Sequence, residues 1–338
     1  MGRHIIRRIL QFIPVFFAAT FLIFYMVFAL PGDPIRALAG EKPMPEPVYR
    51  ALVSRYNLDD PLLVQYGKYI GIWPDADPSC TEDEAKRQQI ERGEIPAETC
   101  FNGVLQGDFG ESFSRRDVGD ILRQKIPVTA KLALMAFVFE IMLGIPAGVL
   151  AGLKRGSFLD NLVLITTTAV ISIPVFVLGY SLQILFGVEL GWFPVSSASG
   201  SFEALMLPAI VLGATSLAYV ARLTRTALVE NMRADYVRTA TAKGLPRRRV
   251  VGKHALRNSL IPVVTYLGID LGALMGGAII TEGIFNVPGI GTEVFRAVRQ
   301  QEGAVVVGIV TFLVIVFMVS TLIVDIMYAW LDPRIRYD

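Results

Sequence analysis

The chain has 338 residues, of which 53% are hydrophobic and only 18% are charged, and its mean hydropathy is +0.51. Soluble domains have about a quarter of their residues charged, and disordered chains are more polar still, so both classes are excluded. The apolar residues are gathered into runs, several of which reach the roughly 20 residues that a helix needs to cross a bilayer. The composition therefore predicts a protein that spans a membrane several times.

Six apolar runs predict six transmembrane helices and an all-α membrane fold. They occupy residues 9–30, 127–152, 161–188, 205–221, 260–280 and 304–330. The first run follows a basic start but is too long for the apolar region of a signal peptide, so we expect a retained helix. Pro174 interrupts the third run and predicts a kink there.

The distribution of charge orients these helices, because Lys and Arg accumulate in short cytoplasmic loops. The loop 222–257 contains ten basic residues against Glu230 and Asp235, whereas residues 31–126 contain 12 Lys and Arg against 17 Asp and Glu. We therefore expect both chain ends in the cytoplasm. The expected parts are an N-terminal tail and first span (1–30), an extracytoplasmic segment (31–126) and a five-span core (127–338) with a cytoplasmic loop (222–258).

Within the extracytoplasmic segment, the sequence predicts helices at 46–56 and 62–71. The charged stretch 73–103 is typical of an exposed insertion, and it contains the only two cysteines, Cys80 and Cys100. Disulfides persist on this side of a membrane, so we expect a bridge, worth on the order of 3 kcal/mol; two free thiols are the alternative. The chain's two histidines are expected on the other side, so no metal site is predicted.

Motifs for nucleotide hydrolysis and for common hydrolase chemistry are absent. The sequence contains no GxxxxGK[ST] phosphate loop, no GxSxG elbow and no HExxH pair. We therefore expect no catalytic residues, no cofactor bound by this chain and no nucleic-acid partner. The function is expected to lie in the spans and in their contacts with other molecules.

The cytoplasmic loop has the punctuation of two short helices. Asp235 can cap the first, Gly244 ends it and Pro246 prevents its continuation. A second helix is expected at 247–257, separated from the next span by a polar cap at 258–259. A short helix held between two spans could transmit force to a cytoplasmic partner; the alternative is a basic loop that only contacts anionic lipid.

The order of residues in this loop resembles the cytoplasmic "EAA" motif of ATP-binding-cassette (ABC) importer permeases. The closest form of the motif is that of the dipeptide/oligopeptide/nickel permease family, roughly DY-x-RTA-x-AKGL followed by HALRN. The matching residues are Asp235, Tyr236, Arg238, Thr239, Ala240, Lys243, Gly244, Leu245, His254 and Arg257. Arg-Thr-Ala replaces the Glu-Ala-Ala of the general motif, so a salt bridge from a motif glutamate cannot be transferred.

The resemblance extends over nearly the whole chain, including Pro-Gly-Asp-Pro at 31–34, Thr-Glu at 281–282 and Pro-Gly-x-Gly at 288–291. The chain is most similar to the "B"-type subunit of oligopeptide and dipeptide permeases. The insertion 73–103 departs from the family core, and the resemblance does not explain it.

This resemblance implies a type I ABC importer permease fold and a permease subunit of a binding-protein-dependent importer for di- and oligopeptides. The implied partners are a second homologous permease subunit, two ATPase subunits that use ATP and Mg, an extracytoplasmic substrate-binding protein, the peptide and membrane lipid. The loop 235–258 would dock on an ATPase subunit, and the location would be a bacterial or archaeal cytoplasmic membrane. Nickel complexes, glutathione or another small solute are alternative cargoes, and a proton-coupled secondary transporter is an alternative class.

Glycines recur every fourth residue in two spans, which places each set on one helix face. The sets are Gly144, Gly148 and Gly152 in the second span, and Gly268, Gly272 and Gly276 in the fifth. Small residues at this spacing let helix backbones approach closely in lipid. Static packing and a moving gate are both compatible with this pattern.

Three acidic residues fall in or near the spans, where carboxylates are costly and are candidates for function. Glu140 and Asp270 could line the translocation pathway, bond to neighbouring helices or relay protons. Asp325 lies close to the cytoplasmic end, where we expect it to pair with Arg334 or another base.

Overall fold

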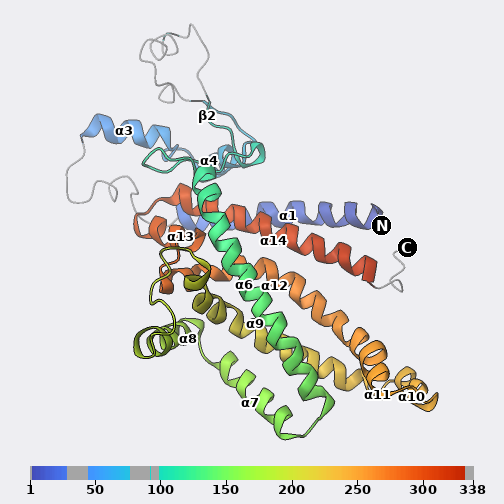
Figure 1. Ribbon diagram of the computed structural model, residues 1–338. Coiled ribbons are helices and arrows are strands. Elements are labelled where there is room, and N and C mark those ends of the chain that lie inside the picture. The colour runs from blue at the N-terminus through green and yellow to red at the C-terminus, as the bar shows by residue number, and fades with distance from the viewer. Residues whose placement is uncertain (1, 29–44, 77–91, 93–98, 332–338) are drawn as a thin grey trace. The chain divides into compact units, whose positions relative to one another are not determined.

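The computed structural model (Figure 1) describes residues 2–28, 45–76, 92 and 99–331. These residues form two compact units. Unit 1 comprises the described residues of 1–10, 126–292 and 316–338, and unit 2 comprises those of 11–125 and 293–315. Four helices contribute residues to both units: α1 (Gly2–Phe28), α6 (Val118–Leu153), α13 (Ile290–Arg299) and α14 (Gly303–Leu331).

Unit 1 is a bundle of membrane-length helices. Besides its share of those four, it contains α7 (Phe158–Ser172), α8 (Val175–Leu182), the π-helical η3 (Gln183–Glu189), α9 (Phe202–Asn231), α10 (Asp235–Ala242), α11 (Arg247–Arg249), the π-helical η4 (Val250–Leu256) and α12 (Arg257–Phe285). Helices α9 and α12 pack side by side, and α7 and α8 pack against α9 (Figure 1). The buried cluster at the centre includes Leu132 of α6, Leu205 and Leu212 of α9, and Leu274 and Phe285 of α12.

The described residues contain five helices that are long and apolar enough to cross a membrane, and a sixth span if the bent pair α7–α8/η3 is counted as one. This confirms the six expected spans. Pro174 breaks the third span as predicted, and the two halves meet at 104°. Ile173 has φ −94° and ψ 125°, because a residue that precedes proline is forced away from helical geometry.

Two boundaries differ from those expected. Helix α9 continues to Asn231, ten residues beyond the predicted end at 221. The helix expected at 247–257 is not separate, because α11, η4 and α12 form one continuous helix from Arg247 to Phe285. The polar cap expected at 258–259 is therefore wrong: the Ser259 hydroxyl donates to the Ala255 carbonyl within the helix at 2.7 Å.

Unit 2 is built on two short helices, α3 (Glu46–Arg55) and α4 (Leu62–Ile70), which confirm the predictions for 46–56 and 62–71. Its buried cluster joins Phe24 of α1, Tyr69 and Ile70 of α4, and Val307 of α14. The Tyr69 hydroxyl also lies 2.7 Å from the Thr311 hydroxyl. Segments far apart in the sequence therefore share one core.

A small antiparallel pair of strands, β1 (Asp75–Ala76) with β2 (Thr99–Phe101), departs from the expected all-α fold. Asp75 pairs with Phe101, and the register is irregular at the next residue. The 3₁₀ turn η2 (Val104–Gln106) follows the second strand. Cys80 lies outside the described residues and the side chain of Cys100 is not described, so the Cys80–Cys100 bridge stays a prediction.

Candidate functional site

Nine of the ten residues of the expected coupling motif lie in a loop segment, residues 232–256, at one end of α9 and α12, and the tenth, Arg257, is the first residue of α12 (Figure 1). Helix α10 begins after Ala234, so Asp235 occupies its first position and not the cap that we expected. Gly244 has φ +75°, a backbone conformation that residues other than glycine rarely adopt. Pro246 then stands before the first residue of α11. The backbone thus reverses sharply between the two helices, as the sequence predicts.

One face of the loop segment is apolar and is seated on the ends of α6 and α9. Val237 and Ala240 of α10 and Val250 and Ala255 of η4 are buried there against Leu228. Val149, Leu153, Met232 and Leu245 complete this contact. The Ser259 hydroxyl also lies 3.2 Å from the Ala227 carbonyl, which ties the start of α12 to α9. The segment is therefore fixed to the bundle.

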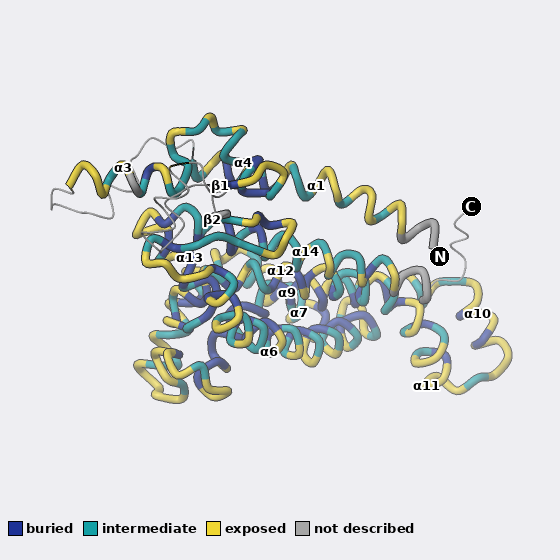
Figure 2. Tube along the Cα trace, turned by 90° about the horizontal axis from the view of Figure 1, so that it is seen from above, coloured by how far each residue is buried: buried dark blue, intermediate teal, exposed yellow. Residues whose placement is uncertain are grey.

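The opposite face is exposed and basic (Figure 2). Of the ten predicted coupling residues, the following are exposed: Asp235, Tyr236, Arg238, Thr239, Lys243, Gly244 and Arg257. Ala240 is buried, and Leu245 and His254 are half-buried. Arg247, Arg248 and Arg249 extend the exposed basic surface. The predicted motif therefore divides into residues that anchor the segment and residues that are available to a partner.

A buried ion pair connects α7 to α9 beside this segment. The Arg225 guanidinium donates two hydrogen bonds to Asp160, both at 2.9 Å, and Asp160 is only 2% exposed. Asp160 also accepts a bond from the Gly156 backbone N–H at 2.8 Å. A two-pronged arginine–carboxylate contact is geometrically specific. This ion pair explains how the charged Arg225 can lie within α9, in the part that the charge distribution assigned to a loop.

Glu282, near the end of α12, holds the first turn of α13. Its fully buried carboxylate accepts hydrogen bonds from the Thr129 hydroxyl at 2.6 Å and from the Gly291 and Thr292 N–H groups at 2.6 and 3.2 Å. A side chain on Gly289 would collide with this carboxylate, since its Cβ would lie 2.2 Å from Glu282 Oε1. The site was not predicted, although Thr-Glu and Pro-Gly-x-Gly were recognised as motif residues.

The glycine sets have different surroundings. A Cβ on Gly144 would lie 2.9 Å from Val220 of α9, and a Cβ on Gly148 would lie 2.4 Å from the Ala221 carbonyl oxygen. A Cβ on Gly152 would lie 3.2 Å from the Arg225 carbonyl oxygen. These three glycines therefore face α9. Gly268 and Gly272 closely approach Val324 and Ser320 of α14, whereas nothing lies within 4 Å of a Cβ on Gly276.

Glu140 of α6 and Asp270 of α12 are brought together inside unit 1. Glu140 is 0% exposed and Asp270 is 9% exposed, and among the described residues neither carboxylate oxygen of Glu140 has a hydrogen-bond partner. The Ser216 hydroxyl of α9 donates to Asp270 at 3.1 Å, and Tyr266 also contacts Asp270. The Ser216–Asp270 bond thus links α9 to α12 beside the buried Glu140 of α6.

Asp325 is paired, but with Arg8 of α1. Arg8 Nε lies 3.1 Å from Asp325 Oδ2. The expectation that Asp325 meets a base is confirmed, and the base comes from the N-terminal helix; Arg334 lies outside the described residues. Among the described residues, no group of three or more His, Cys, Asp or Glu side chains could hold a metal ion.

Comparison with protein families identifies the class to which this bundle and loop segment belong. Residues 144–337 match the family described as "binding-protein-dependent transport system inner membrane component", and residues 1–82 match the N-terminal part described for such components. The chain belongs to this family. It is a multi-pass membrane protein and a permease subunit of a binding-protein-dependent ABC importer.

Similar proteins cover the full length of the chain. The di/tripeptide transport system permease protein DppB of Pseudomonas aeruginosa is 37% identical, over 100% of this chain and 99% of the relative. The glutathione transport system permease protein GsiC of Escherichia coli K12 is 35% identical, over 100% of both chains. These matches confirm the resemblance to the dipeptide/oligopeptide/nickel permease family.

Among solved structures, the MetNI methionine ABC transporter in an inward-facing conformation has a similar fold. The TM-score is 0.53 with 20% sequence identity, over 63% of this chain and 96% of that chain. The similarity supports the type I ABC importer permease fold expected from the sequence.

Proposed function

We propose that this chain forms one half of the translocation pathway of an importer for short peptides, and that its loop segment docks on a separate ATPase subunit. The observation that carries the proposal is the two-faced loop segment. Its apolar face is seated on α6 and α9, and its other face exposes Arg238, Lys243 and the Arg247–Arg249 run. Because α10 is packed on the bundle and exposed on its other face, a partner that moves α10 would also move the helices of the bundle.

The continuity of the helices supports this coupling. The loop segment directly follows α9, and its residues 247–256 are the first part of the single helix 247–285. A displacement of α10 would therefore act on both helices that carry the buried core. Coupling of this kind requires that nucleotide binds one arrangement of the complex better than another.

The proposed complex contains a second homologous permease subunit, two ABC ATPase subunits and an extracytoplasmic substrate-binding protein. ATP and Mg would be used by the ATPase subunits. The basic loop segment would lie in the cytoplasm together with both chain ends, and residues 31–126 would lie outside, because basic short loops are retained inside. The proposed location is the cytoplasmic membrane of a bacterium or archaeon.

The names of the relatives support a short peptide as cargo. One relative is named for di- and tripeptides and another for glutathione, which is itself a small peptide-like zwitterion. Glutathione is therefore the leading alternative within the same chemistry. Nickel complexes are a further alternative that the wider family resemblance leaves open.

Reconstituted transport tests the proposal. Proteoliposomes that contain this chain, the second permease subunit, the ATPases and the binding protein should take up a labelled dipeptide only when ATP is supplied. The same vesicles should be assayed with glutathione and with a nickel complex to distinguish the cargoes. Uptake by this chain alone, driven by a pH gradient without ATP, would instead support the proton-coupled alternative, for which Glu140 and Asp270 would be the relay.

Gly244 provides the sharpest test of docking. We expect Gly244→Pro to keep ATP hydrolysis by the assembled complex but to lose most ATP-driven uptake, because proline cannot adopt φ +75° and the reversal after α10 would change. ATPase and uptake rates are measured on the same vesicles. Coupled transport at the normal ratio of uptake to hydrolysis would rule out the docking role.

Gly191 supplies a matched control. It also has a positive φ, +62°, and nothing lies within 4 Å of its Cβ position, as at Gly244. Gly244→Ala and Gly191→Ala therefore introduce similar backbone strain, of order 1 kcal/mol. Only the change at Gly244 should lower the ratio of uptake to hydrolysis.

A further inference from the structure

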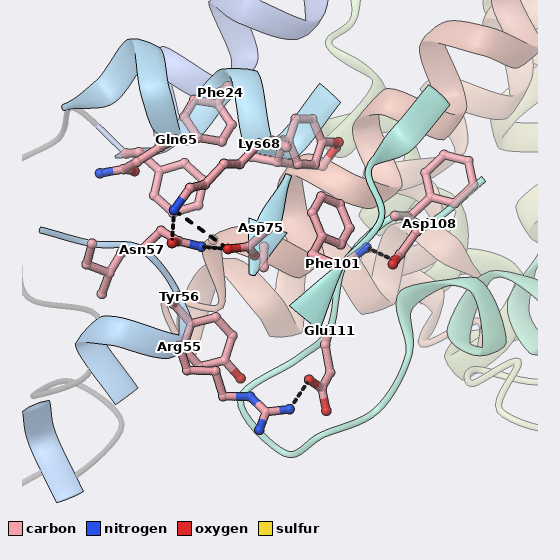
Figure 3. Close-up of a pocket in the computed structure, with 18 of the residues that line it drawn as sticks. Phe24, Arg55, Tyr56, Asn57, Gln65, Lys68, Asp75, Phe101, Asp108 and Glu111 are labelled. Atoms are coloured by element: carbon pink, nitrogen blue, oxygen red, sulfur yellow. Dashed lines mark hydrogen bonds and ion pairs between the residues drawn. The ribbon is translucent and has the colours of Figure 1, made fainter. Parts of the chain in front are cut away.

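Unit 2 contains a pocket of about 350 Å³ that nothing in the proposed coupling uses (Figure 3). It is lined by Arg55 at the end of α3, by the following residues 56–58, by α4 and by the two strands. The loop 108–117 and the adjoining parts of α1 and α14 complete the lining. Its volume falls in the range of sites that hold small molecules, about 300–1,000 Å³. All of its lining residues belong to this one unit.

One part of the lining is aromatic, and the rings support one another. Tyr69 lies parallel to Phe101 with ring centres 6.0 Å apart, and Phe24 lies 5.4 Å from Tyr69. Tyr56 and Phe113 meet edge to face at 4.9 Å. Such mutually packed rings form a pre-organised surface for an apolar side chain.

The polar part of the lining includes two ion-paired clusters. Arg55 donates to Glu111 at 2.7 Å (Figure 3). Lys68 donates to Asp60 at 2.7 Å and to Asn57, and it lies 3.7 Å from Asp75. Asn57 in turn donates to Asp75 at 2.9 Å. Each cluster therefore presents a positive and a negative group to the same pocket.

The other carboxylates of the lining are engaged by the backbone. Asp108 accepts from the N–H groups of Gly110 at 3.0 Å and Asn102 at 3.1 Å, and Asp117 accepts from Gly119. Burial, followed by the charge of Glu111, raises the pKa of Tyr56 to about 12, so its hydroxyl stays neutral and donates to the Ser112 carbonyl. The field in the pocket is thus dipolar and nearly balanced in charge.

We infer that this pocket binds a zwitterionic short peptide with an apolar side chain. The carboxylate of the ligand would meet Arg55 or Lys68, its ammonium group would meet Glu111 or Asp75, and its side chain would lie on the rings of Phe101 and Tyr69. A ligand with a single charge would add a net charge to a lining whose charged groups are already paired, whereas a zwitterion adds none. The inference rests on the proposed function, since it gives the importer a second contact with its cargo, in the pocket of unit 2.

The test measures binding of the dipeptide Ala-Phe to the complete transporter in lipid nanodiscs, without the binding protein. Ala304, at the start of α14, lines the pocket, and Ala304→Phe should fill it and weaken binding about tenfold or more. Leu63→Phe is the matched control, because Leu63 of α4 is 64% exposed and lies outside the lining. Equal affinity of the Ala304→Phe variant and the parent protein would overturn the inference.

Two further measurements remove the dependence on one variant. Ala-Phe with both ends blocked, as the N-acetyl amide, should bind at least about tenfold more weakly than the free dipeptide; equal binding would overturn the zwitterionic assignment. A photoreactive dipeptide should label residues of the loop 108–117, and labelling confined to unit 1 would overturn the pocket assignment. ATP-driven uptake without pocket binding would contradict this inference alone, whereas pocket binding without ATP-driven uptake would contradict the proposed function.

Discussion

At the scale of single residues, Glu282 illustrates how a buried carboxylate is kept in an apolar bundle. A charged group away from water is costly unless it is compensated by hydrogen bonds. Glu282 is 0% exposed, and the Thr129 hydroxyl and two backbone N–H groups at the start of α13 donate to it. The N-terminus of a helix favours negative charge, so α13 and Glu282 stabilise each other.

We expect Glu282→Gln to lower the free energy of unfolding by about 1–3 kcal/mol, because an amide cannot replace both carboxylate oxygens as acceptors. Denaturant-driven unfolding in detergent micelles measures the change. Glu203→Gln is the control, since Glu203 is exposed in the first turn of α9 and should alter stability little. Equal stability of the two variants would show that the carboxylate does not hold the first turn of α13.

At the scale of elements, the same four-residue spacing of glycines has two outcomes. Gly148 lies against α9, where an added Cβ would stand 2.4 Å from the Ala221 carbonyl. Gly276 belongs to an equally regular set in α12, but a Cβ added there would have no neighbouring atom within 4 Å. The spacing predicts that a set shares one face of a helix, whereas the neighbouring helix determines which members are in close contact.

The two glycines should respond in opposite directions to alanine. Gly148→Ala should destabilise the bundle, because a backbone carbonyl of α9 must move to accommodate the methyl group. Gly276→Ala should leave stability unchanged or raise it by up to about 1 kcal/mol, since alanine favours the helix and meets no neighbour. The free energies of unfolding of both variants are measured under identical detergent conditions. A loss of stability in Gly276→Ala would contradict the packing described for α12.

At the scale of the whole molecule, the six spans and the charge distribution together predict an orientation. The loop 222–257 is strongly basic, whereas residues 31–126 carry an excess of acidic groups. Lys and Arg hold short loops on the cytoplasmic side. The orientation therefore follows from where the charges lie along the chain, and the small net charge of +2 conceals it.

Labelling of single cysteines should reveal this orientation. In a background with both native cysteines replaced by serine, Ser114→Cys should react with a membrane-impermeant maleimide in intact cells. Lys243→Cys should react only after the membrane is permeabilised, because its side chain is exposed on the loop segment that we place in the cytoplasm. The reverse pattern of labelling would contradict the expected orientation.

Local features were predictable from the sequence because they depend on neighbouring residues. The lengths of the apolar runs predicted the spans, and the helices α3 and α4 were expected within one or two residues of their bounds. The break at Pro174 and the reversal at Gly244 follow from the backbone preferences of proline and glycine. The order of residues around Gly244 also indicated the family.

The sequence by itself thus determined the class of protein, the number of spans and the position of the loop that we propose to dock on the ATPase. Only the tertiary structure decided the 104° bend, the continuity of the helix from Arg247 to Phe285, and the partners of Arg225 and Glu282. The physical reason is separation along the chain: Thr129 and Glu282 are 153 residues apart, and Arg225 and Asp160 are 65 apart. Periodicity and backbone preference act over a few residues, whereas these contacts, and the pocket of unit 2, arise only when distant helices pack together.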